Sequence, residues 1–99
     1  MNRKRAGKSR LASVRQRIDG IDLALLGLIN RRARLALEIG RIKKRRKWPV
    51  FDAKRETSVL RHVARANRGP LSARAVMHIF QAILCECRRR ERSSKKQSR

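Results

Sequence analysis

Charged side chains interrupt three apolar stripes in this sequence, at positions where packing would favour aliphatic residues. Arg32 occupies one slot of a series of apolar residues spaced by three and four. Lys43, eleven residues later, shares its helical face at a distance of about 16 Å. Asp52 and Glu56 extend the apolar stripe of a second helix backwards, and Glu91 extends that of a third forwards. Two long cationic side chains that lean toward each other could hold one small anion between them, so the pattern predicts an anion site.

The three acidic residues also have structural interpretations. Asp52 can be the N-cap of the second helix, a role that stabilises a helix by about 1 kcal/mol. Asp52 and Glu56 form a like-charge pair four residues apart, which is mildly destabilising unless something separates or uses the two carboxylates. Glu91 lies among the four arginines of residues 88–92, so a satisfied ion pair is the alternative to a functional acid. Both interpretations stay open for each residue.

The apolar spacing predicts an all-α fold of three helices. The first runs from Leu11 to about Lys47 and ends at Trp48-Pro49, because a residue before proline disfavours the α region. The second is expected over about 52–67 and the third over about 72–92, with Gly69-Pro70 between them. The seam of the first helix consists of Leu11, Val14, Ile18, Ile21, Leu25, Leu28, Leu35, Ile39 and Ile42.

The first helix is too long for the remaining residues to cover. At about 1.5 Å per residue it would extend over roughly 55 Å, whereas a compact domain of this length has a radius of gyration of about 13 Å. A second copy of the chain is the natural partner for such a seam. We therefore expect an intertwined helical homodimer.

The composition describes a basic chain with few aromatic residues. With 40% hydrophobic and 36% charged residues, no apolar run of roughly 20 residues and no signal-peptide pattern, we expect a soluble cytoplasmic protein without membrane contact. The formal net charge of +22 makes nucleic acid a candidate partner, but an aromatic content of 3% offers no platform for base stacking. Residues 1–10 are expected to form a basic flexible arm, solvated or anion-binding, and residues 93–99 a disordered basic tail.

The cysteines and histidines do not suggest a metal site. Cys85 and Cys87 are two apart on a helix and point to different faces, so neither a disulfide nor a metal pair is expected. His62 and His78 have no partner at catalytic or metal-binding spacing. We predict neither a metal nor a cofactor.

A set of short motifs closely resembles the all-helical chorismate mutases over about residues 11–92. Each motif is weak alone, but their order and spacing together are specific. They are Arg17-Ile18-Asp19, Arg31-Arg32, Gly40-x-x-Lys43 and Pro49-Val50-x-Asp52-x-x-Arg55-Glu56. The resemblance implies an intertwined dimer of three-helix chains with two active sites, each completed by the long helix of the other chain.

The resemblance also implies a reaction and its residues. Chorismate, a dicarboxylate with a hydroxyl and an enol ether, would rearrange to prephenate, a step of aromatic amino acid biosynthesis that needs no cofactor, nucleophile or metal. Arg32 and Arg15 would hold carboxylates, and Lys43 would contact a carboxylate and the ether oxygen. Asp52 and Glu56 would fix the substrate hydroxyl and orient neighbours, and Arg55 would be a further cation of the site. Arg15 lies seventeen residues before Arg32, roughly 26 Å along one helix, so only Arg15 of a partner chain could join the site.

Two residues depart from the family pattern. Glu91 aligns where many members have Gln that donates to the ether oxygen and where Glu is a known variant, and only a protonated Glu91 can donate. Cys87 aligns where a Ser commonly helps to hold a carboxylate, and its thiol is a weaker donor. We therefore expect Lys43, Glu91 and Arg32 to be catalytic, and activity to fall as Glu91 loses its proton.

Two other functions compete with this interpretation. Isochorismate-pyruvate lyases have a similar site on the same fold and also bind a dicarboxylate enol ether. A basic helical protein that binds nucleic acid or another polyanion would make the site incidental. The second alternative explains the excess of cations, but it leaves inward-facing Asp52, Glu56 and Glu91 without a role.

Overall fold

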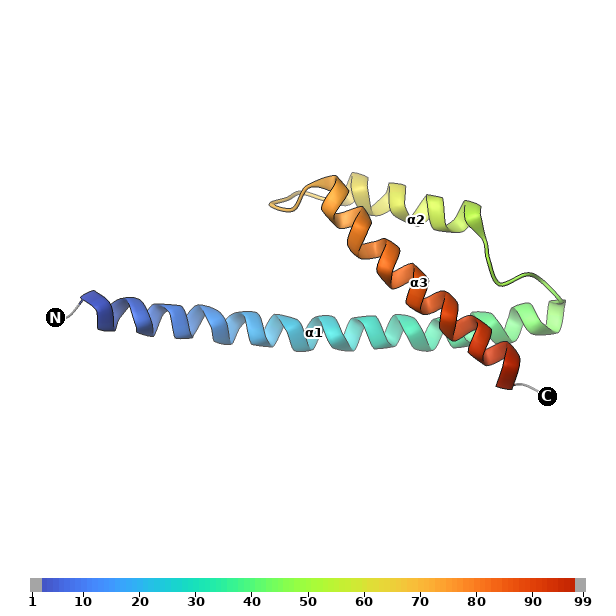
Figure 1. Ribbon diagram of the computed structural model, residues 1–99, viewed down its shortest axis with the longest axis horizontal. Helices are drawn as coiled ribbons and strands as arrows, with labels where there is room; N and C mark the ends of the chain where they lie inside the picture. The colour runs from blue at the N-terminus through green and yellow to red at the C-terminus, as the bar shows by residue number, and fades with distance from the viewer. Residues whose placement is uncertain (1–2, 98–99) are drawn as a thin grey trace. The chain divides into compact units, whose positions relative to one another are not determined.

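Three helices form the described part of the chain, residues 3–97, with side chains described for residues 5–93. In the computed structural model they are α1 (Arg3–Arg46), α2 (Ala53–Ala66) and α3 (Ala73–Gln97) (Figure 1). The predicted all-α fold of three helices with a long first helix is confirmed. Among the described residues, no helix combines the length and the apolar character that a membrane span requires.

Local sequence explains where the helices end and begin. Past α1, Lys47 has a φ of 57°, and the amide of Trp48 donates to the carbonyl of Lys43 at 2.9 Å before Pro49 stops the helix. Asp52 caps α2, because its Oδ1 accepts from the amide of Arg55 at 3.0 Å. Ser72 caps α3 in the same way, through its Oγ and the amide of Ala75 at 3.0 Å.

Both outer helices extend further than the apolar pattern predicts. α1 begins at Arg3, so residues 3–10 are helical although they were expected to form a flexible arm. α3 continues through residues 93–97, which were expected to belong to a disordered tail. Apolar periodicity reports on burial, whereas Arg, Lys, Ala and Gln extend an existing helix readily without it. Residues 1–2 of the arm and 98–99 of the tail lie outside the described residues.

The chain divides into two units, Met1–Arg31 and Arg32–Arg99. In the first unit, every side chain described, from residue 5 to residue 31, is exposed. In the second unit α2 packs against α3, and the buried apolar side chains are Ala36, Leu84 and Cys87. These three residues come from the last part of α1 and from α3, and they support the pocket described next.

Candidate active site

A pocket of about 320 Å³ lies within residues 32–99 and is built from all three helices. It contains seven of the eight predicted site residues, and the eighth, Arg15, belongs to the other unit. The lining residues are Arg32, Leu35, Ala36, Ile39, Lys43, Val50, Asp52, Arg55, Glu56, Val59, Leu84, Cys87 and Glu91. The volume is at the small end of the range for ligand pockets, which suits a small metabolite.

The apolar part of this pocket is the core of the unit. Ala36, Leu84 and Cys87, exposed by only 5%, 8% and 6%, all line it. Because core side chains are tightly packed, the core holds the polar residues of the same helices in fixed positions. Cys87 is a buried free thiol at this position.

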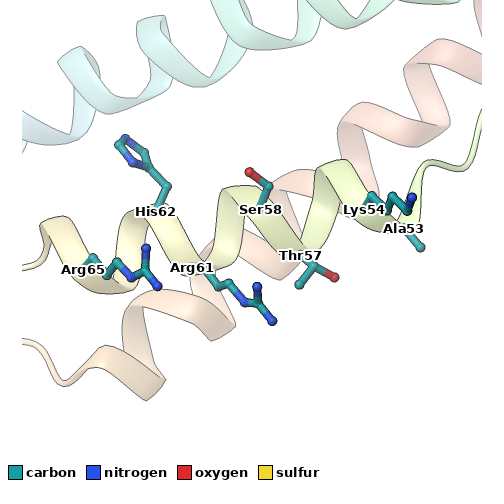
Figure 2. A pocket seen from close by; sticks show the side chains of 7 residues that line it. All are labelled: Ala53, Lys54, Thr57, Ser58, Arg61, His62 and Arg65. Carbon is teal, nitrogen blue, oxygen red and sulfur yellow. The ribbon is translucent and has the colours of Figure 1, made fainter.

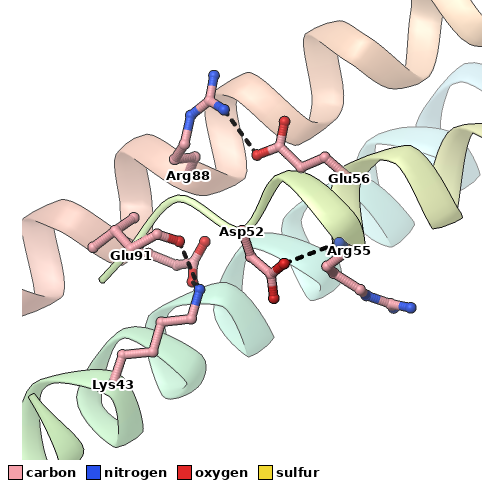
Figure 3. Close-up of polar contacts among 7 residues, drawn as sticks. Lys43, Asp52, Arg55, Glu56, Arg88 and Glu91 are labelled. Carbon is pink, nitrogen blue, oxygen red and sulfur yellow. Dashed lines mark hydrogen bonds and ion pairs between the residues drawn. The ribbon is translucent and has the colours of Figure 1, made fainter. Parts of the chain in front are cut away.

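Lys43 and Glu91 form the most buried ion pair of the pocket. Lys43 Nζ lies 2.8 Å from Glu91 Oε1, and the two side chains are 15% and 13% exposed (Figure 3). Lys43 Nζ also donates to the carbonyl oxygen of Val50 at 2.7 Å. Among the described residues Glu91 Oε1 has no partner at hydrogen-bond geometry, so its contact with Lys43 is an ion pair by distance alone. The sequence suggested a neighbouring arginine as the partner, whereas the structure brings a lysine from α1.

Asp52 is the N-cap of α2 and also lines the pocket. Its Oδ1 accepts from the amide of Arg55, so the N-cap interpretation is confirmed. The same residue lines the pocket beside Arg55 and Glu56. A carboxylate has two acceptor oxygens, and the cap uses Oδ1, which leaves Oδ2 for a ligand.

Glu56 is paired with a residue that the sequence did not assign to the site. Arg88 Nη1 lies 2.8 Å from Glu56 Oε2, with 23% and 25% of the two side chains exposed (Figure 3). The Arg88 guanidinium carbon also lies 5.0 Å from the centre of the Phe51 ring. This pairing offsets the like-charge contact of Glu56 with Asp52. The sequence signals were the unusual arginine cluster of residues 88–90, which could alter affinity, and the position of Arg88 next to Cys87 on the inward stripe of α3.

Arg32 and Lys43 line the same pocket, as their shared helical face predicted. Arg32 is half-buried. The histidines lie elsewhere: His62 and His78 are exposed and line two other hollows, on the surfaces of α2 and α3. In the part of the chain that the structure describes, no group of His, Cys, Asp and Glu side chains could hold a metal ion.

An all-helical unit with a small pocket that joins three cations to three carboxylates defines a class of helical proteins with a charged binding pocket. Comparison with known proteins agrees with this class. Residues 14–92 match the family described as chorismate mutase type II. The chain therefore belongs to the chorismate mutase type II family, and residues 14–92 are its chorismate mutase domain.

Individual relatives support the assignment. A bifunctional chorismate mutase/prephenate dehydratase of Pseudomonas aeruginosa is 38% identical over 87 residues, which cover 83% of this chain and 24% of the relative. One from Aquifex aeolicus is 35% identical over 81 residues, 78% of this chain and 22% of the relative. The solved structure of a chorismate mutase from Thermus thermophilus superposes with a TM-score of 0.83 at 29% identity and covers 84% of this chain and 94% of that one. This chain spans less than a quarter of the length of these two curated relatives.

Proposed function

We propose that this chain is an isomerase that converts chorismate to prephenate. The observation that carries the proposal is convergence: seven residues that the family resemblance assigns to chorismate line one pocket of about 320 Å³. They come from positions up to 59 residues apart in the sequence, from Arg32 to Glu91, so chance neighbours along one helix do not explain the set. The charges are also of the right kind, because a dicarboxylate needs cations and its hydroxyl needs an acceptor.

The reaction is an intramolecular rearrangement in which an ether bond breaks while a carbon–carbon bond forms. The protein must fold the substrate into a reactive conformation and stabilise the charge that develops on the ether oxygen. In our proposal Arg32 binds a carboxylate, and Lys43 contacts both a carboxylate and the ether oxygen. Lys43 has three donors, of which the carbonyl of Val50 takes one. The other two donors of Lys43 are then available to the substrate.

Two carboxylates would hold the substrate hydroxyl in this scheme. Asp52 keeps one oxygen for the cap of α2, so its other oxygen and Glu56 are the acceptors for that hydroxyl. A protonated Glu91 would donate to the ether oxygen. Cys87 is a weak donor, so the carboxylate contact that a Ser would make is not expected from its thiol.

We also propose that the active form is a homodimer in which Arg15 enters the site of the partner chain. Support comes from the first unit, where all described side chains are exposed, including Leu23 at 71% and Leu28 at 60%. A single helix with so many exposed apolar residues gains its stability from packing against something else. A second copy presents a matching seam, and Arg15 lies within this segment.

Steady-state kinetics with the purified chain and chorismate tests the proposal. We expect the absorbance of chorismate to disappear and prephenate to form, without added metal or cofactor. The lyase alternative predicts pyruvate from isochorismate instead. Release of pyruvate together with an absence of prephenate would overturn the proposal and favour the lyase.

A second candidate function, polyanion binding, is favoured by one hollow on α2. It is lined only by residues of that helix, which lie on one face, and Figure 2 shows their side chains. Three are cations and none is acidic: the set is Ala53, Lys54, Thr57, Ser58, Arg61, His62 and Arg65. Cations and hydroxyls in a row are typical contacts to a nucleic-acid backbone, which carries no sequence information.

Salt-dependent binding to duplex DNA tests this candidate. Reversing two charges in Arg61→Glu/Arg65→Glu should reduce the slope of log affinity against log salt by about 2. The matched control Arg90→Glu/Arg92→Glu changes the net charge equally on exposed positions of α3. Equal losses in the two variants would mean that only net charge matters and that α2 carries no site.

A further inference from the structure

Arg88 stands beside the pocket and contacts two features of the start of α2. Its Nη1 lies 2.8 Å from Glu56 Oε2, and its guanidinium carbon lies 5.0 Å from the centre of the Phe51 ring. Phe51 directly precedes Asp52, the N-cap of α2. The guanidinium of Arg88 therefore connects α3 to a residue just before the N-cap of α2 and to a residue in its first turn.

The burial of the Glu56–Arg88 pair separates it from an ordinary surface contact. Its two side chains are 23% and 25% exposed, whereas the neighbouring Arg89–Glu86 pair, at 2.9 Å, is 65% and 67% exposed. Solvent screens the exposed pair strongly and the half-buried pair much less. Arg88 therefore has the geometry to fix a pocket carboxylate, and Arg89 does not.

We propose that Arg88 is a positioning residue for the mutase site, an inference that rests on the proposed function. It fixes the Glu56 carboxylate through Oε2, so that Oε1 is presented to the hydroxyl of the substrate. Arg88 also offsets the negative charge of Glu56, which reduces the repulsion between this carboxylate and a dianionic substrate. The guanidinium lies over the Phe51 ring while it donates to Glu56, a combination that a lysine ammonium cannot reproduce.

The test compares Arg88→Met with the matched control Arg89→Met, using purified full chain and chorismate. Both variants remove one positive charge from adjacent residues of α3. Arg88→Met should raise KM on the order of tenfold and change kcat little, because a contact present in both ground and transition states affects binding uniformly. Arg89→Met should leave KM at the wild-type value. Equal KM values in the two variants would overturn the proposal.

A double-mutant cycle with Glu56→Gln separates positioning from a general structural effect. If Arg88 acts through Glu56, Arg88→Met should change KM less than twofold in the Glu56→Gln background. A full tenfold effect in that background contradicts the inference. If Arg88→Met loses helical circular dichroism, Arg88→Lys replaces it and should raise KM several-fold, and an unchanged KM in Arg88→Lys would also overturn the inference. Absence of chorismate turnover in the wild type, by contrast, would contradict the proposed function itself.

Discussion

Arg32 shows at the scale of single residues how a packing position becomes a binding position. It occupies a seam slot of α1, is half-buried, and lines the pocket together with Lys43 and Arg55. Arg32→Ala should lower kcat/KM by about 10²–10³-fold, because a substrate carboxylate loses its charged partner in a half-buried site. The thermal midpoint should stay the same or rise, because the loss of Arg32 lowers the repulsion among the three cations of the pocket. Activity assays and thermal unfolding check the two expectations.

Arg34→Ala is the matched control for this substitution. Arg34 is two residues further along α1 and exposed, and it is not among the residues that line the pocket. Its removal should leave kcat/KM near the wild-type value. An unfolded Arg32→Ala variant would show that Arg32 is a structural residue and not a ligand for substrate.

Glu91 leads to a prediction about pH. A carboxyl group donates a hydrogen bond only when protonated, whereas the amide of Gln donates at any pH. The wild-type kcat/KM should therefore decrease toward alkaline pH, and Glu91→Gln should remove this decrease. A pH series from acidic to alkaline buffers, with the wild type measured in parallel, gives the comparison. The same downward limb in the variant would exclude Glu91 as the donor.

At the scale of elements, substitutions at the caps of α2 and α3 distinguish an effect on stability from an effect on activity. Asp52 and Ser72 each accept from the amide three residues later, at 3.0 Å in both cases. Asp52→Ala and Ser72→Ala should each lower the free energy of unfolding by about 1 kcal/mol. Only Asp52 lines the pocket, so only Asp52→Ala should also reduce kcat/KM. Denaturant titration and kinetics on the two variants test this, and a matching loss of activity in Ser72→Ala would mean that the cap itself limits catalysis.

Sequence patterns could predict elements and their inward faces, but not the pairings between elements. The three-to-four spacing around Arg32 and the stripe that ends at Glu91 placed both residues on inward faces, and it was the family resemblance that joined them in one site. The partner of Glu91 is Lys43, 48 residues away on another helix, and local sequence favoured the adjacent arginines instead. The Glu56–Arg88 pair was missed for the same reason, because side-chain pairing across helices depends on their packing. Helix ends were predicted well where a cap or proline marks them and poorly in the basic termini.

At the scale of the whole molecule, the proposed crossing of Arg15 between chains predicts complementation. In the proposed dimer each site uses Arg32 of one chain and Arg15 of the other. A heterodimer of Arg15→Ala and Arg32→Ala chains would then have one intact site and one doubly damaged site. With random mixing, half of all dimers are heterodimers, and each heterodimer has one intact site out of two. Mixed samples should therefore recover roughly a quarter of wild-type activity. Each variant alone should remain nearly inactive.

The measurement requires unfolding the two variants together and refolding them, with each variant refolded alone as the control. Recovery should increase with the fraction of heterodimer, which differently tagged chains allow one to quantify. If each site were completed within one chain, an active site would need intact Arg15 and Arg32 in the same chain. Mixing would produce no such chain, and activity would stay at the sum of the two controls. That outcome would reject the shared site even if size measurements showed a dimer.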